Sequence, residues 1–292
     1  MIFSRATPLM TCRLIASLAL VAAAATGCGG DDPAGTQGVV QLSDAAISFD
    51  AEQYGGSPSS RTVAVTSSAG QISDLDVTID YAPSEPTGWL TATLSDETTP
   101  ASLTLTATTS TVPGGIHVAT VSVAPANDPG AAKNIAVTFR VAPLLGYPVE
   151  SPNVININFG FLYGLPIAVP APTNLVSVNF IVKSPLEAGT QAKVGLYADN
   201  AGNPGALVAA TPATTVILGR NEIPLTAVLA PGTYWFMIVV SKQTYFSYGG
   251  PHLTKNATHP FADPLPDPFP SFHSTSEPPG GLSLNFFLKT TP

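Results

Sequence analysis

Apolar and polar residues alternate with a period of two through residues 42–143, as they do in strands that have one face in water. In the clearest segment, Leu103, Leu105 and Ala107 share one face, while hydroxyl-bearing residues form the other. The same alternation recurs near the end of this region, on a face made of Ile135, Val137, Phe139 and Val141. Clusters of Gly, Pro, Asp and Ser separate the seven segments of this kind and indicate turns. The pattern predicts an antiparallel β-sandwich of the immunoglobulin type.

A second region, residues 144–292, follows a short joint at 142–148 that is rich in proline. Its apolar segments predict strands at 154–159, 175–182, 191–197, 214–218, 222–225, 232–241 and 282–289. Residues 233–240 are apolar on both faces, which is typical of a central strand, so we expect Trp235 in the middle of the core. The sequence therefore predicts an all-β protein with two consecutive antiparallel sandwiches.

Residues 1–27 have the features of an export signal. Arg5 and Arg13 precede an uncharged apolar run, residues 14–25, which is too short to cross a bilayer as a helix. The run ends in Ala-Thr-Gly, and Cys28 follows. This ending resembles the lipobox of bacterial lipoproteins, which implies that the signal is removed and that Cys28 carries lipid.

Residues 28–41 are rich in Gly, Asp and Pro and predict a flexible tether. Gly29 follows the cysteine, where an Asp typically retains such proteins at the inner membrane. The resemblance therefore implies lipid anchoring in the outer membrane, and both faces of that membrane are compatible with the chain. The alternative is an ordinary secretory peptide that is cut near Ala24 and leaves Cys28 unmodified.

Charge and cysteine content narrow the range of partners. Without residues 1–27 the chain has 9 basic and 19 acidic residues, a net charge of −10, which argues against nucleic acid. Cys12 leaves with the signal, and lipid on Cys28 would leave no thiol for a disulfide, so the exported chain must depend on core packing. We therefore expect attachment to the membrane through lipid, and no cofactor.

Three motifs in residues 42–143 share the pattern of a known family. Gly88-Trp89-Leu90 is followed by PASLTLT at 100–106 and by PGGIHVATVSV at 113–123. The region resembles the BACON-type immunoglobulin-like domains of bacteria, which implies a spacer that accompanies glycan-handling proteins. His117 stands where that family has an aromatic residue. We expect Trp89 in the core and His117 packed at the margin of a sheet.

The region 144–292 contains VGLYADNAGNPGALV at 194–208 and LAPGTYW at 229–235. These motifs resemble a jelly-roll-like β-sandwich module of secreted and cell-surface bacterial proteins. The resemblance implies a non-catalytic surface module, and it brings neither a catalytic residue nor a ligand.

The turn after residue 198 places the side-chain oxygens of Asp199, Asn200 and Asn203 close together. Calcium takes six to eight oxygen ligands, so carbonyl groups or distant carboxylates would have to complete a site here. The alternative is a turn that its Asp and Asn side chains stabilise without metal. We favour the turn and keep calcium as the alternative.

Residues 245–281 are rich in proline and aromatic residues and show no period, which predicts a long loop pinned between two strands. One interpretation is a sugar-binding lip, in which Tyr245 and Tyr248 stack on pyranose rings while Asp263 and Asp267 accept protons from sugar hydroxyls. The alternative is that the loop is packed onto its own sandwich by Phe261, Phe269 and Phe272.

The sequence contains no G-x-S-x-G elbow, no H-E-x-x-H motif and no phosphate-binding glycine loop, so we expect no catalytic residue. The working hypothesis is a non-catalytic, lipid-anchored envelope protein that binds a glycan or an envelope polymer through residues 144–292. The alternatives are a purely structural or adhesive protein without a small ligand and, at lower weight, a carbohydrate-active enzyme, whose paired carboxylates leave no local motif.

Overall fold

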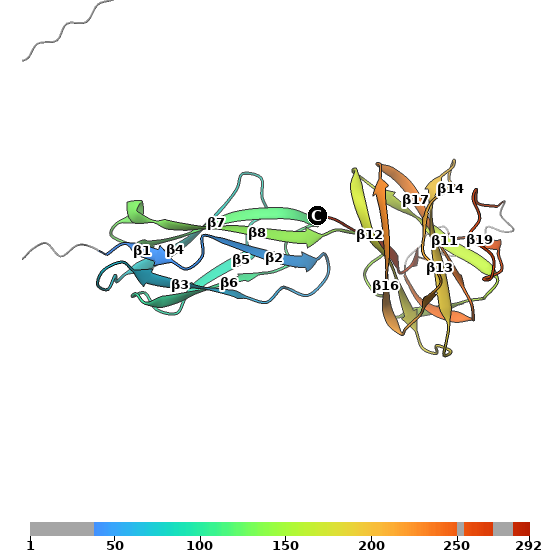
Figure 1. The fold of residues 1–292 in the computed structure, drawn as a ribbon, viewed down its shortest axis with the longest axis horizontal. Helices are drawn as coiled ribbons and strands as arrows, with labels where there is room; N and C mark the ends of the chain where they lie inside the picture. Colours follow the sequence, from blue (N-terminus) through green and yellow to red (C-terminus); the bar gives the residue numbers. More distant parts are fainter. Residues whose placement is uncertain (1–37, 250–253, 271–282) are drawn as a thin grey trace, which may run out of the picture. The chain divides into compact units, whose positions relative to one another are not determined.

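The computed structural model describes residues 38–249, 254–270 and 283–292. The predicted signal at 1–27, Cys28 and the tether as far as residue 37 lie outside this part of the chain. Within it, every regular element is a strand except one short 3-10 helix at Pro129–Ala131, so the all-β prediction is confirmed. None of these residues forms a helix long and apolar enough to cross a lipid bilayer. Gly38 to Pro292 form one compact unit, and Figure 1 shows its strands.

The first sandwich packs two four-stranded sheets against each other. One sheet has the strand order β1 (Val40–Leu42), β3 (Arg61–Ser67), β6 (Ala101–Ala107) and β5 (Leu90–Leu94). The other has the order β2 (Ala46–Glu52), β8 (Lys133–Ala142), β7 (Gly115–Pro125) and β4 (Leu75–Tyr81). Their inward residues form a single core, because side chains on a strand alternate between its two faces.

Two buried side chains of this sandwich lie where the sequence predicts them. Trp89 is fully buried and packs against Tyr81 and Phe139, which confirms its expected place in the core. His117 is also buried, at the margin, where its ring lies 3.0 Å from a Glu85 carboxylate oxygen and 3.0 Å from the Pro113 carbonyl oxygen. The strictly antiparallel prediction is wrong at one place, because β2 and β8 pair in parallel over seven residue pairs.

The second sandwich is built from a seven-stranded and a six-stranded sheet. The first sheet has the order β10 (Asn153–Ile157), β18 (Thr244–Gly249), β12 (Thr173–Lys183), β21 (Phe286–Thr290) and β9 (Leu144–Gly146). Two further strands join it: β16 (Gly219–Leu229) pairs with β12, and β20 (Ser283–Leu284) pairs with β18. The other has the order β14 (Pro204–Ala210), β13 (Gln191–Asp199), β17 (Gly232–Val240), β11 (Phe161–Val169) and β19 (Lys255–Thr258), and β15 (Thr214–Thr215) pairs with β13.

The strand β17 is buried on both faces, as its sequence predicts, but the two faces meet different surroundings. One face enters the main core between the sheets through Phe236, Ile238 and Val240. The other lies on the outside of its sheet through Trp235, Met237 and Val239, in a separate outer cluster. Trp235 is therefore not in the middle of the main core, because the segment 260–269 covers its face of the sheet.

The strand β11 lies in a segment for which the sequence predicts no strand. Gly164 is required there by close packing, because an added Cβ would overlap the carbonyl oxygen of Phe236 and the side chain of Met237 on β17. Pro166 lies beyond the described pairing with β19, so among the described residues β11 has a hydrogen-bonded neighbour there on one side only.

The predicted long loop at 245–281 is wrong at its beginning. Residues 245–249 belong to β18, which pairs with β10 and β12, and β19 pairs with β11. The predicted strand at 214–218 is reduced to the two residues of β15, because the amide side chain of Asn221 bonds both the N–H and the carbonyl of Ile217 and forms a turn.

Candidate functional site

The tyrosines of the predicted sugar-binding lip lie on β18 and point to opposite faces of their sheet. Tyr248 packs against the main core, next to the buried Phe246. Tyr245 is half-buried and stands opposite Asn156 and Lys183 on the two neighbouring strands. A flat aromatic platform made of both rings is therefore not formed.

The two aspartates of that lip belong to the segment 260–269, which covers the outer face of the other sheet. The carboxylate of Asp267 accepts a hydrogen bond from the Leu207 N–H at 3.0 Å. Lys193 donates from its ammonium group to the carbonyl oxygens of Phe261 and Asp263, at 2.5 and 3.0 Å. The structure therefore does not bring the tyrosines and the aspartates of the lip together.

The alternative for this segment, packing onto its own sandwich, fits the geometry. Phe269 is buried and meets the ring of Tyr197 edge to face, with 5.1 Å between centroids. Its N–H donates to the Gly205 carbonyl at 2.9 Å, and Phe261 packs against the same outer cluster. Phe272 lies outside the described residues.

The turn at Asp199 uses its side-chain oxygens for contacts within the protein. One carboxylate oxygen of Asp199 accepts a hydrogen bond from the indole N–H of Trp235 at 2.7 Å, and the other accepts one from Gly202 N–H at 3.0 Å. The ammonium group of Lys255 binds the side-chain oxygen of Asn203 and the carbonyl of Gly202. A positive charge of the chain itself thus occupies oxygens that calcium would need, and this favours the interpretation as a stabilised turn.

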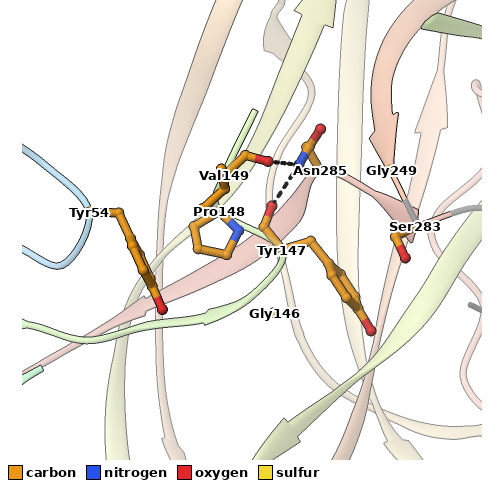
Figure 2. Close-up of a pocket in the computed structure, with 8 residues that line it drawn as sticks. All are labelled: Tyr54, Gly146, Tyr147, Pro148, Val149, Gly249, Ser283 and Asn285. Atoms are coloured by element: carbon orange, nitrogen blue, oxygen red, sulfur yellow. Dashed lines mark hydrogen bonds between the residues drawn. The ribbon is translucent and has the colours of Figure 1, made fainter. Parts of the chain in front are cut away.

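A shallow pocket with a volume of about 310 Å³ lies where the first sandwich meets the second (Figure 2). The first sandwich contributes Tyr54 from the turn that follows β2. The second contributes Gly146, Tyr147, Pro148, Val149, Gly249, Ser283 and Asn285. None of the residues predicted to bind a ligand lines this pocket, although Tyr248 is adjacent to Gly249 in the chain.

One wall of the pocket is held in place by Asn285. Its side-chain amide donates to the carbonyl oxygens of Tyr147 and Val149, at 3.0 and 2.6 Å, as the dashed lines of Figure 2 show. Its side-chain oxygen accepts the N–H of Ser151 at 3.2 Å. Three backbone groups at alternate residues of an otherwise irregular segment thus have a fixed partner, which makes the wall rigid before any ligand arrives.

The pocket wall begins at Gly146, where the backbone conformation and the close packing both require glycine. Its φ is +105°, a conformation that residues with a side chain rarely adopt. A Cβ at this position would also lie 2.7 Å from the carbonyl oxygen of Phe286 on the neighbouring strand. Glycine is therefore required for both the turn and the close approach.

The pocket offers two kinds of unused contact. Tyr54 is 65% exposed and has a φ of +61°, a left-handed conformation that is uncommon for a residue with a side chain. Ser283 is only 3% exposed, and its hydroxyl has no hydrogen-bond partner within the described ranges. A buried hydroxyl without a partner is costly, and an aromatic face in water is available for stacking.

Among the described residues no charged side chain lines the pocket. Burial raises the pKa of the Tyr147 phenol, which therefore stays neutral at physiological pH. Nor do three or more His, Cys, Asp or Glu side chains gather in a metal-binding arrangement anywhere in the described part of the chain. The chemistry available here is aromatic contact with backbone and hydroxyl hydrogen bonds, which suits an uncharged polar ligand.

Comparisons with known proteins give little further information. No protein-family model and no curated protein matches the chain. Among solved structures, the secreted serine protease VesC from Vibrio cholerae matches with 9% identity and a TM-score of 0.27, over 72% of this chain and 50% of its own. Tripeptidyl peptidase 2 matches with 11% identity and a TM-score of 0.26, over 73% of this chain and 21% of its own.

A two-domain protein of unknown function from Bacteroides fragilis matches with 10% identity and a TM-score of 0.27, over 72% of this chain and 94% of its own. This chain therefore spans about half the length of the Vibrio protease and about a fifth of tripeptidyl peptidase 2. At these TM-scores no conclusion about fold or activity follows from the matches.

Proposed function

We propose that this protein is a lipid-anchored, non-catalytic component of the bacterial cell envelope that binds an uncharged glycan. The binding site is the pocket between Tyr54 and the wall that Asn285 holds. The observation that supports it most directly is an exposed aromatic ring together with a buried Ser283 hydroxyl. Within the described residues this hydroxyl has no partner and the pocket lining carries no charge. Sugar rings present one apolar face for stacking and several hydroxyls for hydrogen bonds.

The resemblance of residues 42–143 to BACON-type domains supports the same proposal, because such domains accompany glycan-handling proteins. The resemblance of Cys28 and its preceding residues to a lipobox supports anchoring in the outer membrane, with residues 28–41 as the tether. The purely adhesive alternative needs no pocket at all, so the two functions differ in a measurable way.

Binding is tested with a soluble chain of residues 38–292, which contains both cores of the compact unit. Its retention on immobilised neutral and acidic polysaccharides is measured first, and affinities for soluble oligosaccharides follow by calorimetry. We expect retention on at least one neutral polysaccharide and a loss of about tenfold in affinity in Tyr54→Ala, about 1.4 kcal/mol. No retention across the panel would contradict glycan binding and favour the adhesive alternative.

Tyr245→Ala is the matched control for that experiment, because Tyr245 is a tyrosine of the same protein placed away from the pocket lining. We expect it to bind like the wild type. A loss in Tyr245→Ala with none in Tyr54→Ala would move the site to β18 and restore the sugar-binding lip.

Anchoring is tested with the full chain. Cys28→Ala should leave the membrane fraction, because several acyl chains are needed for stable attachment. A variant that remains bound to membranes after a wash with high salt would exclude the lipidated cysteine as the anchor.

A further inference from the structure

The proposed pocket exists only while the two sandwiches keep their relative position, because Tyr54 belongs to the first and the opposite wall to the second. Tyr54 stands two residues after Glu52, the last residue of β2. Between them, Gln53 donates from its N–H to the Ala142 carbonyl at 3.0 Å, and its side chain accepts the Leu144 N–H at 3.3 Å. The short segment 52–54 therefore carries the contacts that place Tyr54.

Glu52 makes the charged contacts of this segment. Its carboxylate accepts a hydrogen bond from the Arg220 guanidinium at 2.6 Å and pairs with the ammonium group of Lys289. Both cations belong to the second sandwich, on β16 and β21. Glu222, also on β16, balances them from the other side, at 3.1 Å from Arg220 and 3.2 Å from Lys289.

The second sandwich holds its half of this cluster in a fixed geometry. Arg220 donates from Nε to the buried Asn179 side-chain oxygen at 2.9 Å, and its guanidinium lies over the Phe287 ring, 5.2 Å from the centroid. Ser177 donates to Glu222 at 2.9 Å. An arginine that is already oriented loses less side-chain entropy when it binds a carboxylate, so Glu52 meets a prepared partner.

Glu52 balances the charge of the cluster. Arg220 and Lys289 are two cations, and Glu52 and Glu222 are the two anions that face them. Without the Glu52 charge, two cations would share one carboxylate, and nothing ionic would join the first sandwich to the second at this point.

We propose that Glu52 is a positioning residue, an ionic latch that fixes Tyr54 against the wall at 146–149 and so sets the affinity of the pocket. This proposal rests on the proposed glycan function. It has an unusual consequence: an uncharged ligand in an uncharged pocket should bind in a manner that depends on salt. The Debye length falls from about 10 Å at 0.1 M salt to about 3 Å at 1 M, which weakens a partly exposed latch.

The test compares wild type with Glu52→Gln, which keeps the shape of the side chain and removes its charge. We expect affinity for the retained oligosaccharide to fall about threefold to tenfold in Glu52→Gln, and its salt dependence to disappear. The matched control is Glu187→Gln, which removes the carboxylate of an exposed pair with Lys242, 2.7 Å long and confined to the second sandwich. It should bind like the wild type at every salt concentration.

A second readout needs no sugar. Small-angle X-ray scattering of the soluble chain should show a broader range of inter-sandwich distances in Glu52→Gln than in the wild type and in Glu187→Gln. If the wild type binds no glycan while scattering still broadens, the glycan function fails and the latch stands. If scattering is unchanged, or if affinity is unchanged although scattering broadens, the positioning role of Glu52 is wrong.

Discussion

The two sandwiches bury apolar surface in different ways. In the first, each strand has one face in the core and the other in water, and the alternation in sequence shows this directly. In the second, the sheet that contains β17 is covered on both sides, by the main core and by the segment 260–269. A strand that is apolar on both faces therefore indicates only that both are covered. It does not say whether a sheet or a loop covers each of them.

The largest expected effect separates the two cores. Trp89→Ala removes a fully buried ring from the first sandwich and should lower its free energy of unfolding by about 3–5 kcal/mol. The second core shares no residue with the first and should unfold at its original temperature. Scanning calorimetry distinguishes this from a single transition that shifts as a whole, which would show that the sandwiches unfold together.

The next effect tests the covering loop. Phe269→Ala should cost about 3 kcal/mol, the lower end for a buried phenylalanine, because the residue is 8% exposed. Phe159→Ala is the matched control, since that ring is 64% exposed and its loss should cost less than about 0.5 kcal/mol. Urea unfolding measures both, and equal effects would mean that the segment 260–269 does not support β17.

A smaller effect tests the turn that supports Trp235. Asp199→Ala removes two hydrogen bonds and leaves the buried indole N–H without its acceptor, at a cost of about 1–2 kcal/mol. Thermal melts of wild type and variant should give the same difference with calcium and with EDTA. A difference that appears only with calcium would restore the calcium site of Asp199, Asn200 and Asn203.

The smallest effect lies at the contact between the sandwiches. Burial raises the pKa of Glu52, but the hydrogen bonds and charges of Arg220 and Lys289 outweigh it and leave the pKa below its ordinary value of 4.5. A carboxylate whose pKa is lower in the folded than in the unfolded protein stabilises the fold at any pH above its unfolded-state pKa. This stabilisation is lost as the pH falls through its folded-state pKa. For Lys289, burial lowers the pKa and the two carboxylates raise it more, so its contribution is lost only above about 10.5.

We therefore expect the stability difference between wild type and Glu52→Gln to be less than about 1 kcal/mol at neutral pH. It should decline as the pH falls below 4.5 and vanish below the lowered pKa of Glu52 in the folded protein. Denaturant unfolding at several pH values measures it. A difference that grows as the pH falls would reverse the sign of this argument.

Sequence patterns predict the first sandwich well because its strands have one face in the core and one in water. Apolar and polar residues therefore alternate along each strand. They fail for β11, where Gly164 and Pro166 are poor strand formers taken alone and acceptable only beside β17. The pair of β2 with β8 was likewise not predictable as parallel, since local alternation says nothing about the direction of a neighbour.

The pocket could not be predicted from sequence for a related reason. Tyr54, the segment 146–149 and Asn285 are separated by roughly a hundred residues at each step, and none of them stands in a motif. Tyr245 and Asp267, which the sequence suggested, have the right chemistry for sugar. Packing places Tyr245 on one sheet and Asp267 in the segment that covers the other. The one local signal for Tyr54 is its position between a predicted strand and a Gly-Gly turn.

The parallel pairing of β2 with β8 has a mechanical consequence when the chain is pulled at the two ends of this pair. The chain reaches the start of β2 shortly after the three-residue strand β1 and leaves the first sandwich at the end of β8. A pull between those two points slides one strand along the other, so the load falls on all the hydrogen bonds of the seven-pair ladder at once. An antiparallel pair loaded at adjacent ends would open one bond at a time. In the proposed lipid-anchored protein, the pair of β2 and β8 would therefore resist such a pull in shear.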